Sequence, residues 1–298
     1  MNIVIEPGLY VVAVSGGVDS IALLDILHKM MPAEGLKLIV AHYDHGIRSD
    51  SKGDRLFVQS ISDKYGLPFI YDEGRLGINA SEAVARDARY IFLDKVQKTS
   101  GARAIITAHH QDDMLETAII NIMRGTGRRG LTSLSSSGSI VRPLLHFNKN
   151  DIKEYVKLHN LDWREDSSNS DTKYLRNYVR HNLLTKFDDS DKLEMLSHIN
   201  KLSVINSELN GDLAKYLEIH SAPNQLDRHW FIMLPHAVAR EVMHSWLRGQ
   251  DVVSIDRRQI ERLVHGSKTL SLGRKLSVDK THQITIKKNY LALDSHER

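Results

Sequence analysis

Short apolar runs alternate with longer amphipathic stretches over the first 150 residues, and this alternation restricts the fold more than any other feature. The apolar runs lie at residues 9–15, 36–43, 67–71, 103–108 and 139–145, and the helical patterns at residues 19–31, 54–65, 81–99, 112–124 and 149–159. Runs that are apolar on both faces and separated by helices are typical of a parallel sheet covered on both sides. We therefore expect a doubly wound α/β domain that binds its ligand at the carboxyl ends of the strands.

The pattern changes near residue 190, which predicts a larger α/β domain at residues 1–188 and a smaller, mainly helical α+β domain at residues 189–298. Apolar side chains recur every three or four residues from Leu193 to Leu213, so one amphipathic helix is expected there. Docking of this stripe on the rest of the protein is the simpler explanation, and a homodimer interface is the other. The second domain is completed by two helices and a small antiparallel sheet, expected at residues 236–248, 256–265 and 270–293.

Composition excludes several classes of protein. Hydrophobic residues make up 41% of the chain and charged residues 26%, as in soluble globular proteins, and no apolar run approaches the roughly 20 residues that span a bilayer. The absence of cysteine excludes disulfides, thiolate metal sites and persulfide chemistry. Residues 1–8 show no basic region followed by an apolar segment, so we expect no secretory signal, no membrane partner and a cytoplasmic location.

A turn joins the first expected strand to the first expected helix, and it consists of Ser15, Gly16, Gly17, Val18, Asp19 and Ser20. Two glycines let the backbone turn tightly and approach a ligand closely. The free N–H groups at a helix start favour an anion, and serine hydroxyls can donate to phosphate oxygens. Asp19 fits such a site if a divalent cation lies between it and the phosphates; otherwise it caps the helix.

Other phosphate-binding loops fit less well. The turn contains no lysine and G-x-x-x-x-G-K-[ST] is absent, which disfavours a Walker-type nucleotidase. Residues 125–130 read GTGRRG and match G-x-G-x-x-G. They follow a predicted helix instead of a strand, so we interpret this match as accidental.

Charged residues follow the second and fourth predicted strands. Asp44 and His45 come at the end of the second strand, and Asp113 and Glu116 lie three residues apart after the fourth. That spacing puts both carboxylates on one helix face, where they suit an ammonium group or a magnesium ion. Acidic residues also stabilise a helix start without any ligand. The nearby histidines do not form a zinc motif, and the chain has no cysteine.

Arginines are frequent in the second half of the α/β domain, at Arg124, Arg128, Arg129, Arg142, Arg164, Arg176 and Arg180. Guanidinium groups suit phosphates and planar groups, although a solvated surface position is an equal explanation for any single one. From Leu247 onward the chain has eleven lysines and arginines against six acids. This excess, which includes Arg257 and Arg258, indicates either a solvated face or contact with a nucleic-acid backbone.

The turn at residues 15–20 resembles the PP-loop of the N-type ATP pyrophosphatases, and the downstream motifs resemble the tRNA(Ile)-lysidine synthetase family. The resemblance covers residues 9–181. Four of its motifs are DHGIR at 44–48, ARDARY at 85–90, HHQDDMLET at 109–117 and MRGTG at 123–127. Ser167 departs from the family pattern, since many members have proline there, and the length fits the shorter form with one accessory domain.

The resemblance implies an ATP-dependent carbon–nitrogen ligase. In this family ATP adenylates the oxygen on carbon 2 of the wobble cytidine in the CAU anticodon of tRNA(Ile), with release of pyrophosphate. The ε-amine of free L-lysine then displaces AMP to give lysidine. The family thus implies ATP with magnesium, L-lysine and tRNA(Ile) as substrates and partners, a catalytic domain at residues 1–188 and a tRNA-binding accessory domain at residues 189–298.

The resemblance also implies roles for individual residues. The turn at residues 15–20 binds ATP, and Asp19 faces magnesium. Asp113 and Glu116 bind the lysine ammonium group. Catalytic roles fall on Asp19, Asp44, His45, Arg86 and Arg176. Contacts with tRNA fall on Arg124, Arg180, Arg257 and Arg258.

Two alternatives stay open: another PP-loop ligase or amidotransferase, and a non-catalytic nucleotide-binding module. A PP-loop tRNA thiolase needs cysteines to carry sulfur, and the chain has none. An ammonia-dependent ligase gives no reason for the arginines at 124–129 and 176–180. A non-catalytic module predicts ATP binding without pyrophosphate release.

Overall fold

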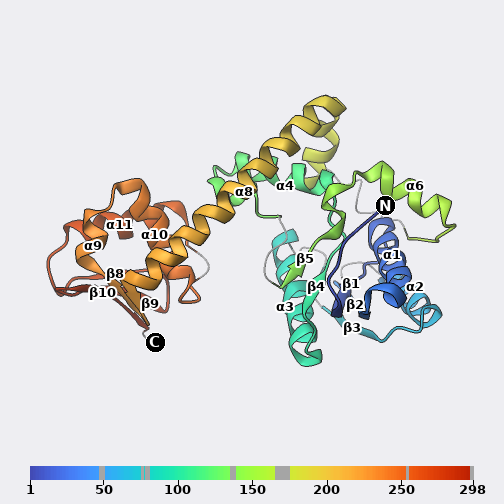
Figure 1. Ribbon diagram of the computed structural model, residues 1–298, viewed down its shortest axis with the longest axis horizontal. Coiled ribbons are helices and arrows are strands. Elements are labelled where there is room, and N and C mark those ends of the chain that lie inside the picture. Colours follow the sequence, from blue (N-terminus) through green and yellow to red (C-terminus); the bar gives the residue numbers. More distant parts are fainter. Residues whose placement is uncertain are drawn as a thin grey trace. The chain divides into compact units, whose positions relative to one another are not determined.

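The computed structural model describes residues 1–46, 51–74, 77, 81–134, 139–164, 175–252 and 255–295. The chain forms two compact units, Met1–Ser203 and Val204–Arg298 (Figure 1). The division falls inside the long helix α8, Asp189–His220. The predicted domain boundary after residue 188 lies directly before this helix and stays a prediction.

Five parallel strands form the sheet of the first unit, in the order β3-β2-β1-β4-β5. Their bounds are β1 Gly8–Ala13, β2 Leu36–Asp44, β3 Phe69–Glu73, β4 Ala104–Ile106 and β5 Ile140–Val141. The chain adds strands to one side of β1 and then continues with β4 on the other side. A sheet of this topology binds ligands outside the carboxyl ends of the two strands where the order reverses. The predicted doubly wound sheet is confirmed.

Helices cover both faces of this sheet. Alternate side chains of β1 enter different cores: Tyr10 and Val12 pack with α1 and α6, whereas Val11 packs with α3. The helices of the α/β alternation are α1 Val18–Glu34, α2 Ser51–Lys64, α3 Glu82–Ser100, α4 Gln111–Met123 and α6 Lys149–Leu158. Every residue from Ser20 to Leu27 of α1 is buried, because this helix lies between the sheet and α6.

A third core of the first unit is formed where α4 contacts the chain after residue 175. Leu115 of α4, Val179 and Leu184 are buried together with Leu196 and Ile199 of α8. The short elements of this unit are α5 Arg128–Leu131, η1 Pro143–His146, α7 Leu175–Tyr178, the π-helical turn η3 Val179–Leu183 and η4 Leu184–Lys186. This packing brings the arginines near residue 180 beside α4.

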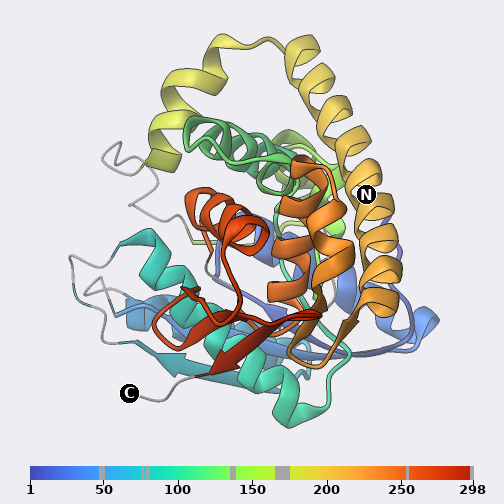
Figure 2. The same cartoon turned by 90° about the vertical axis from the view of Figure 1, so that its left-hand side faces the viewer.

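The second unit is an antiparallel sheet with helices packed against it (Figure 2). Its strands are ordered β6-β7-β10-β9-β8, with bounds β6 Ser221–Ala222, β7 Gln225–Asp227, β8 Lys275–Ser277, β9 His282–Ile286 and β10 Tyr290–Ser295. Its helices are α9 Arg228–Met233, α10 His236–Arg248 and α11 Arg257–Thr269. Phe231, Trp246 and Leu263 are fully buried in its core. The predicted α+β character of this part is confirmed, although β6, β7 and α9 were not expected.

None of the helices in the described ranges is both long enough and apolar enough to cross a membrane.

Candidate active site at the carboxyl edge of the parallel sheet

The turn at residues 15–20 leads from β1 into α1. Gly16 has φ of 95°, a left-handed conformation that side chains rarely adopt, so a glycine is required there. Gly17 is the N-cap of α1 and supplies no side-chain cap. The first N–H groups of α1 therefore lack a side-chain acceptor and form the type of helix start that attracts anions.

Serine hydroxyls bind the backbone of the turn itself. Ser20 Oγ accepts from the N–H groups of Ser15 and Gly16, both at 3.2 Å, and donates to the Gly17 carbonyl at 2.9 Å. Ser15 Oγ accepts from the N–H of Gly17 at 3.3 Å. When a phosphate binds these N–H groups, its oxygens therefore replace the serine hydroxyls as hydrogen-bond acceptors.

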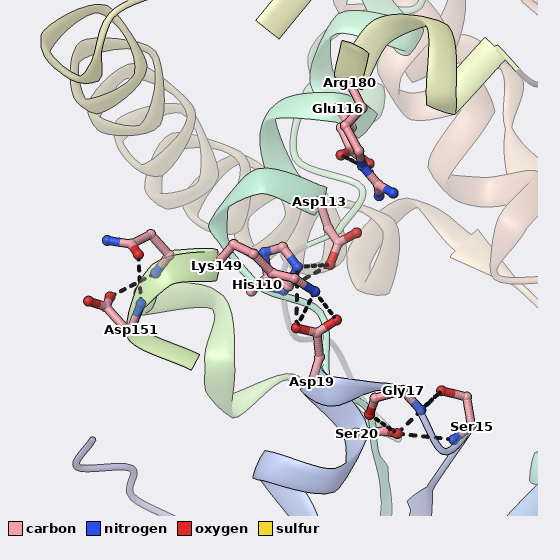
Figure 3. A network of polar contacts seen from close by, with 11 residues as sticks. Ser15, Gly17, Asp19, Ser20, His110, Asp113, Glu116, Lys149, Asp151 and Arg180 are labelled. Carbon is pink, nitrogen blue, oxygen red and sulfur yellow. Dashed lines mark hydrogen bonds and ion pairs between the residues drawn. The ribbon is translucent and has the colours of Figure 1, made fainter. Parts of the chain in front are cut away.

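Asp19 points away from the turn and towards α6. Lys149 Nζ lies 2.6 and 2.7 Å from the two carboxylate oxygens of Asp19 (Figure 3). His110 Nε2 lies 3.8 Å from Asp19 Oδ1. Because Gly17 is the N-cap, Asp19 does not cap the helix, and its carboxylate is available to a cation.

Asp113 lies in the first turn of α4, directly after β4. Its Oδ2 accepts from the N–H of His110 at 3.0 Å and lies 3.5 Å from His110 Nε2. Burial alone would raise the pKa of Asp113, but His110, Arg176 and the hydrogen bond from the His110 backbone outweigh it and lower the pKa. Asp113 is therefore a charged carboxylate at neutral pH.

The side chains of these elements line a cavity of about 360 Å³. Its lining residues are Asp19, His110, Asp112, Asp113, Lys149, Lys153, Arg180 and His181. Three carboxylates and three cations face the same space, so the wall suits a ligand that carries both signs of charge, or an anion that arrives with a cation.

Glu116 lies one turn further along α4, beyond the cavity wall. It is fully buried, and arginine side chains bind both of its oxygens. Arg176 Nε lies 2.9 Å from Oε2, while Arg180 donates to both oxygens at 2.6 and 3.0 Å. Burial alone would lower the pKa of Arg180, but the bond to Glu116 outweighs this and raises it. A lysine ammonium at Glu116 would compete with two guanidinium groups.

A second group of cations lies on α3 and at the end of β5. The guanidinium carbons of Arg86 and Arg89 lie 5.0 and 5.5 Å from the centre of the Tyr90 ring, within the range of a cation–π contact. Arg142 follows β5 and is 5% exposed. Its burial lowers its pKa, and the electrostatic interaction with Tyr90 opposes the shift.

His109 connects the two groups electrostatically. Burial lowers its pKa to about 3, and the nearby arginines of the second group act in the same direction, whereas Asp113 opposes them. Its Nδ1 lies 2.9 Å from Thr107 Oγ1. His109 is therefore a neutral imidazole at physiological pH.

Asp44 ends β2 and is buried. Its Oδ1 accepts from the N–H of Gly46 at 2.8 Å, which fixes the carboxylate at the carboxyl end of the strand. His45 follows it and packs edge-on against Tyr43, with ring centres 5.0 Å apart. The remainder of the DHGIR motif, residues 47–48, lies outside the described residues.

The segment after α6 contacts the turn at residues 15–20. The N–H of Arg164 donates to the Gly16 carbonyl at 3.0 Å, and Arg164 Nε lies 2.6 Å from Oδ1 of Asp54 on α2. The segment WREDSSN at residues 163–169 therefore starts beside the turn. Its continuation, including Ser167, lies outside the described residues.

A model of the PP-loop domain family matches residues 6–187 of the chain. The chain belongs to this family. The turn at residues 15–20 is thus a PP-loop, at the topological position that the sequence predicted for it.

Sequence comparison gives relatives named tRNA(Ile)-lysidine synthase. The protein from Thermotoga maritima is 38% identical over 188 residues, which is 60% of this chain and 45% of that protein. The one from Geobacter sulfurreducens is 40% identical over 184 residues, or 58% of this chain and 39% of that protein. The one from Francisella tularensis subsp. holarctica is 29% identical over 97% of this chain and 74% of its own length. The chain thus spans less than half the length of the first two.

Among solved structures, the PP-loop chain is similar to the U34-tRNA thiolase NcsA from Methanococcus maripaludis, which contains a [4Fe-4S] cluster. The TM-score is 0.54 at 15% identity, over 66% of this chain and 73% of that one. At this identity the likeness concerns the fold alone.

The structure brings only some of the predicted site residues to the PP-loop. Asp19, Asp113 and Arg180 line one cavity, with Glu116 and Arg176 directly behind it. Arg124 is the exposed C-cap of α4, about 20 Å along that helix from its start. Arg257 and Arg258 are exposed at the start of α11 in the second unit.

Five lining residues of the cavity were not predicted as site residues: His110, Asp112, Lys149, Lys153 and His181. A signal for Lys149 was available, since it opens the helix that follows the fifth predicted strand. That position corresponds to the position of Asp19 after the first strand.

The PP-loop cavity offers few protein ligands for a metal ion. The described part of the chain contains no group of three or more histidine, aspartate or glutamate side chains arranged to hold a metal ion. Magnesium commonly binds one or two carboxylates together with substrate phosphates and water. Asp19 beside the PP-loop fits that mode, and a site formed by protein side chains alone does not.

Proposed function

We propose that this PP-loop protein is a tRNA(Ile)-lysidine synthetase of the short form. ATP adenylates the oxygen on carbon 2 of the wobble cytidine of the CAU anticodon, and the ε-amine of L-lysine then attacks that carbon and displaces AMP to form lysidine. The observation that carries the proposal is that Asp19 of the PP-loop, Asp113 and Arg180 line one cavity, with Arg176 bound to Glu116 directly behind it. The chain is also similar over 188 residues to a protein named for this activity.

The PP-loop is proposed to hold the phosphates of ATP. The first N–H groups of α1 and the hydroxyls of Ser15 and Ser20 face the pyrophosphate leaving group, and favourable helix-start electrostatics support this. Asp19 would hold magnesium together with the phosphates, and the ion would neutralise their charge. Asp44, His45 and Arg86 line the nucleotide and the adenylate.

Lysine is proposed to bind at the acids of α4. Asp113 faces the cavity as a charged carboxylate, which suits an ammonium group. Glu116 is proposed to complete this site from behind, through the arginines that it binds. Arg176 thereby receives a fixed position from which it contacts the nucleotide.

The tRNA is proposed to contact exposed cations of both units. Arg180 lies at the cavity, and Arg124, Arg257 and Arg258 are exposed. Binding through phosphates makes the affinity fall steeply with salt. A homodimer is also proposed, because Leu193, Ile205 and Leu209 of α8 are exposed apolar side chains that a second copy of the chain could cover.

The test is incubation with ATP, L-lysine and a tRNA(Ile) transcript bearing CAU, followed by nucleoside mass spectrometry. We expect the mass of cytidine to increase by one condensed lysine at the wobble position. A transcript with the same body and a GAU anticodon is the control and should stay unmodified. Absence of the product, beside an active reference synthetase, would contradict the proposal, and ATP binding without pyrophosphate release would favour a non-catalytic module.

A further inference from the structure

The PP-loop carries no lysine of its own, but the fold supplies one from far along the chain. Lys149 is 130 residues away from Asp19 in sequence, and its Nζ lies 2.6 and 2.7 Å from the two Asp19 oxygens. The ammonium group therefore sits at the first turn of α1, beside the PP-loop (Figure 3). In Walker-type loops a lysine within the loop reaches the β- and γ-phosphates.

Packing of α6 against α1 fixes Lys149 in this place. Ile152 and Val156 of α6 are fully buried in the core that contains α1. The hydroxyl of Tyr155 donates to Asp25 Oδ2 at 2.6 Å. Asp19 and Asp25 are spaced along α1 as Lys149 and Tyr155 are along α6, so the two helices run in the same direction and contact each other at both levels.

The start of α6 is held separately. Asn148 and Asp151 form a capping box: the Asn148 side chain accepts from the N–H of Asp151 at 2.9 Å, and the Asp151 side chain accepts from the N–H of Asn148 at 2.9 Å. Lys149 is the first residue inside this capped turn. Its backbone is therefore fixed, while its side chain, 31% exposed, retains access to the cavity.

The other cations of the cavity are placed differently. Arg180 is bound to both oxygens of the buried Glu116, which directs its guanidinium to α4. Lys153 lies one turn further along α6 than Lys149. Lys149 is thus the cavity cation in direct contact with a residue of the PP-loop.

We propose that Lys149 contacts the β- and γ-phosphates of ATP and stays with pyrophosphate as it leaves. This rests on the proposed function. In the adenylation step the oxygen on carbon 2 of cytidine bonds to the α-phosphorus. The bond from that phosphorus to the bridging oxygen breaks, and its electron pair remains on pyrophosphate. Lys149 keeps its proton throughout and stabilises the added charge, having moved from Asp19 to the phosphate oxygens.

The test separates diphosphate contact from general support of the site. Inorganic pyrophosphate and AMP are titrated calorimetrically into the wild-type chain and into Lys149→Gln, Lys149→Arg and Lys157→Gln. We expect Lys149→Gln to weaken pyrophosphate binding about tenfold to a hundredfold and to leave AMP binding unchanged, because AMP lacks both outer phosphates. Lys149→Arg should keep most of the affinity. Lys157, exposed on the same helix, is the matched control.

Unchanged pyrophosphate affinity in Lys149→Gln would overturn the inference. An equal loss of affinity for AMP and pyrophosphate would also overturn it, since Lys149 would then support the site as a whole. Retained AMP binding shows that the variant is folded. A wild-type chain that binds pyrophosphate through Lys149 but forms no lysidine would refute the proposed function and leave the inference standing.

Discussion

Two carboxylates near the PP-loop bind cations in opposite ways. Asp19 is 26% exposed in its side chain and pairs with a single lysine at the wall of a cavity. Glu116 is fully buried and binds two arginines through both of its oxygens. A partly exposed pair gains little net stability because water solvates both ions well, whereas a buried acid stripped of its partners is costly.

This difference separates what can change during a reaction from what must stay fixed. The lysine at Asp19 can leave, because water or an incoming ligand can replace it. The arginines at Glu116 cannot leave without stranding a buried charge. We infer that the Asp19 side of the cavity exchanges partners during turnover, and that Glu116 keeps the arginine side rigid.

The largest expected effect is at Glu116. Glu116→Gln leaves two arginines beside a neutral side chain, and we expect the free energy of unfolding to fall by about 3–5 kcal/mol. Urea unfolding followed by circular dichroism measures it. Glu154→Gln, on the exposed face of α6, is the control and should change little. A loss below about 1 kcal/mol would remove the contrast with Asp19.

Asp25 provides an intermediate case. It is 4% exposed, and Tyr65, Tyr155 and Lys29 bind its carboxylate. Asp25→Asn should cost about 2 kcal/mol, because hydrogen bonds to a buried charge are lost.

Asp94 is the matched control, since it also pairs with a lysine four residues on at 2.7 Å but is 47% exposed. Asp94→Asn should cost less than about 0.5 kcal/mol. Equal losses in the Asp94 and Asp25 variants would show that burial does not decide the strength of these pairs.

The third prediction uses pH. Burial lowers the pKa of His109 from 6.5 to about 3. Between pH 6.5 and 3, His109 is therefore protonated in the unfolded chain and neutral in the folded chain. Stability is therefore lost as pH falls from 6.5 towards 3. His109→Gln should recover on the order of 2 kcal/mol of that loss at pH 4–5, measured by urea unfolding at several pH values.

The control for this variant is His198→Gln, at a position whose side chain is 68% exposed. Parallel stability curves for wild type and His109→Gln would contradict the shifted pKa.

The smallest expected effect on stability is at Asp19. Asp19→Asn should change the free energy of unfolding by less than about 1 kcal/mol. It should still lower the rate of lysidine formation, because the carboxylate that binds a cation beside the PP-loop is lost. Unfolding and product formation are measured on the same preparation. A loss of stability as large as that of Glu116→Gln would contradict the contrast between a replaceable pair at Asp19 and a fixed one at Glu116.

Much of the fold follows from local pattern. Strand β2 begins at Leu36 and α10 runs from His236 to Arg248, as the sequence predicts, because β2 is a long, mostly buried run and α10 is a long amphipathic helix. The bounds of shorter strands were predicted less accurately. The expected strand at residues 139–145 ends at Val141, since Pro143 has no N–H for a ladder and begins a 3-10 turn instead.

The candidate site was predictable only where it depends on local spacing. Asp113 and Glu116 share a helix face, as expected, but one reaches the cavity and the other meets two arginines. Sequence spacing cannot show this, because Arg176 and Arg180 lie 60 and 64 residues beyond Glu116. The pairing of Lys149 with Asp19 depends in the same way on how α6 docks against α1.

The hydroxyls of Ser15 and Ser20 hold the PP-loop in one conformation between two rounds of ligand binding. They provide acceptors for three backbone amides, so the loop keeps its shape when no phosphate is present. Departure of a product then leaves a template that is ready for the next molecule, with no slow refolding between cycles.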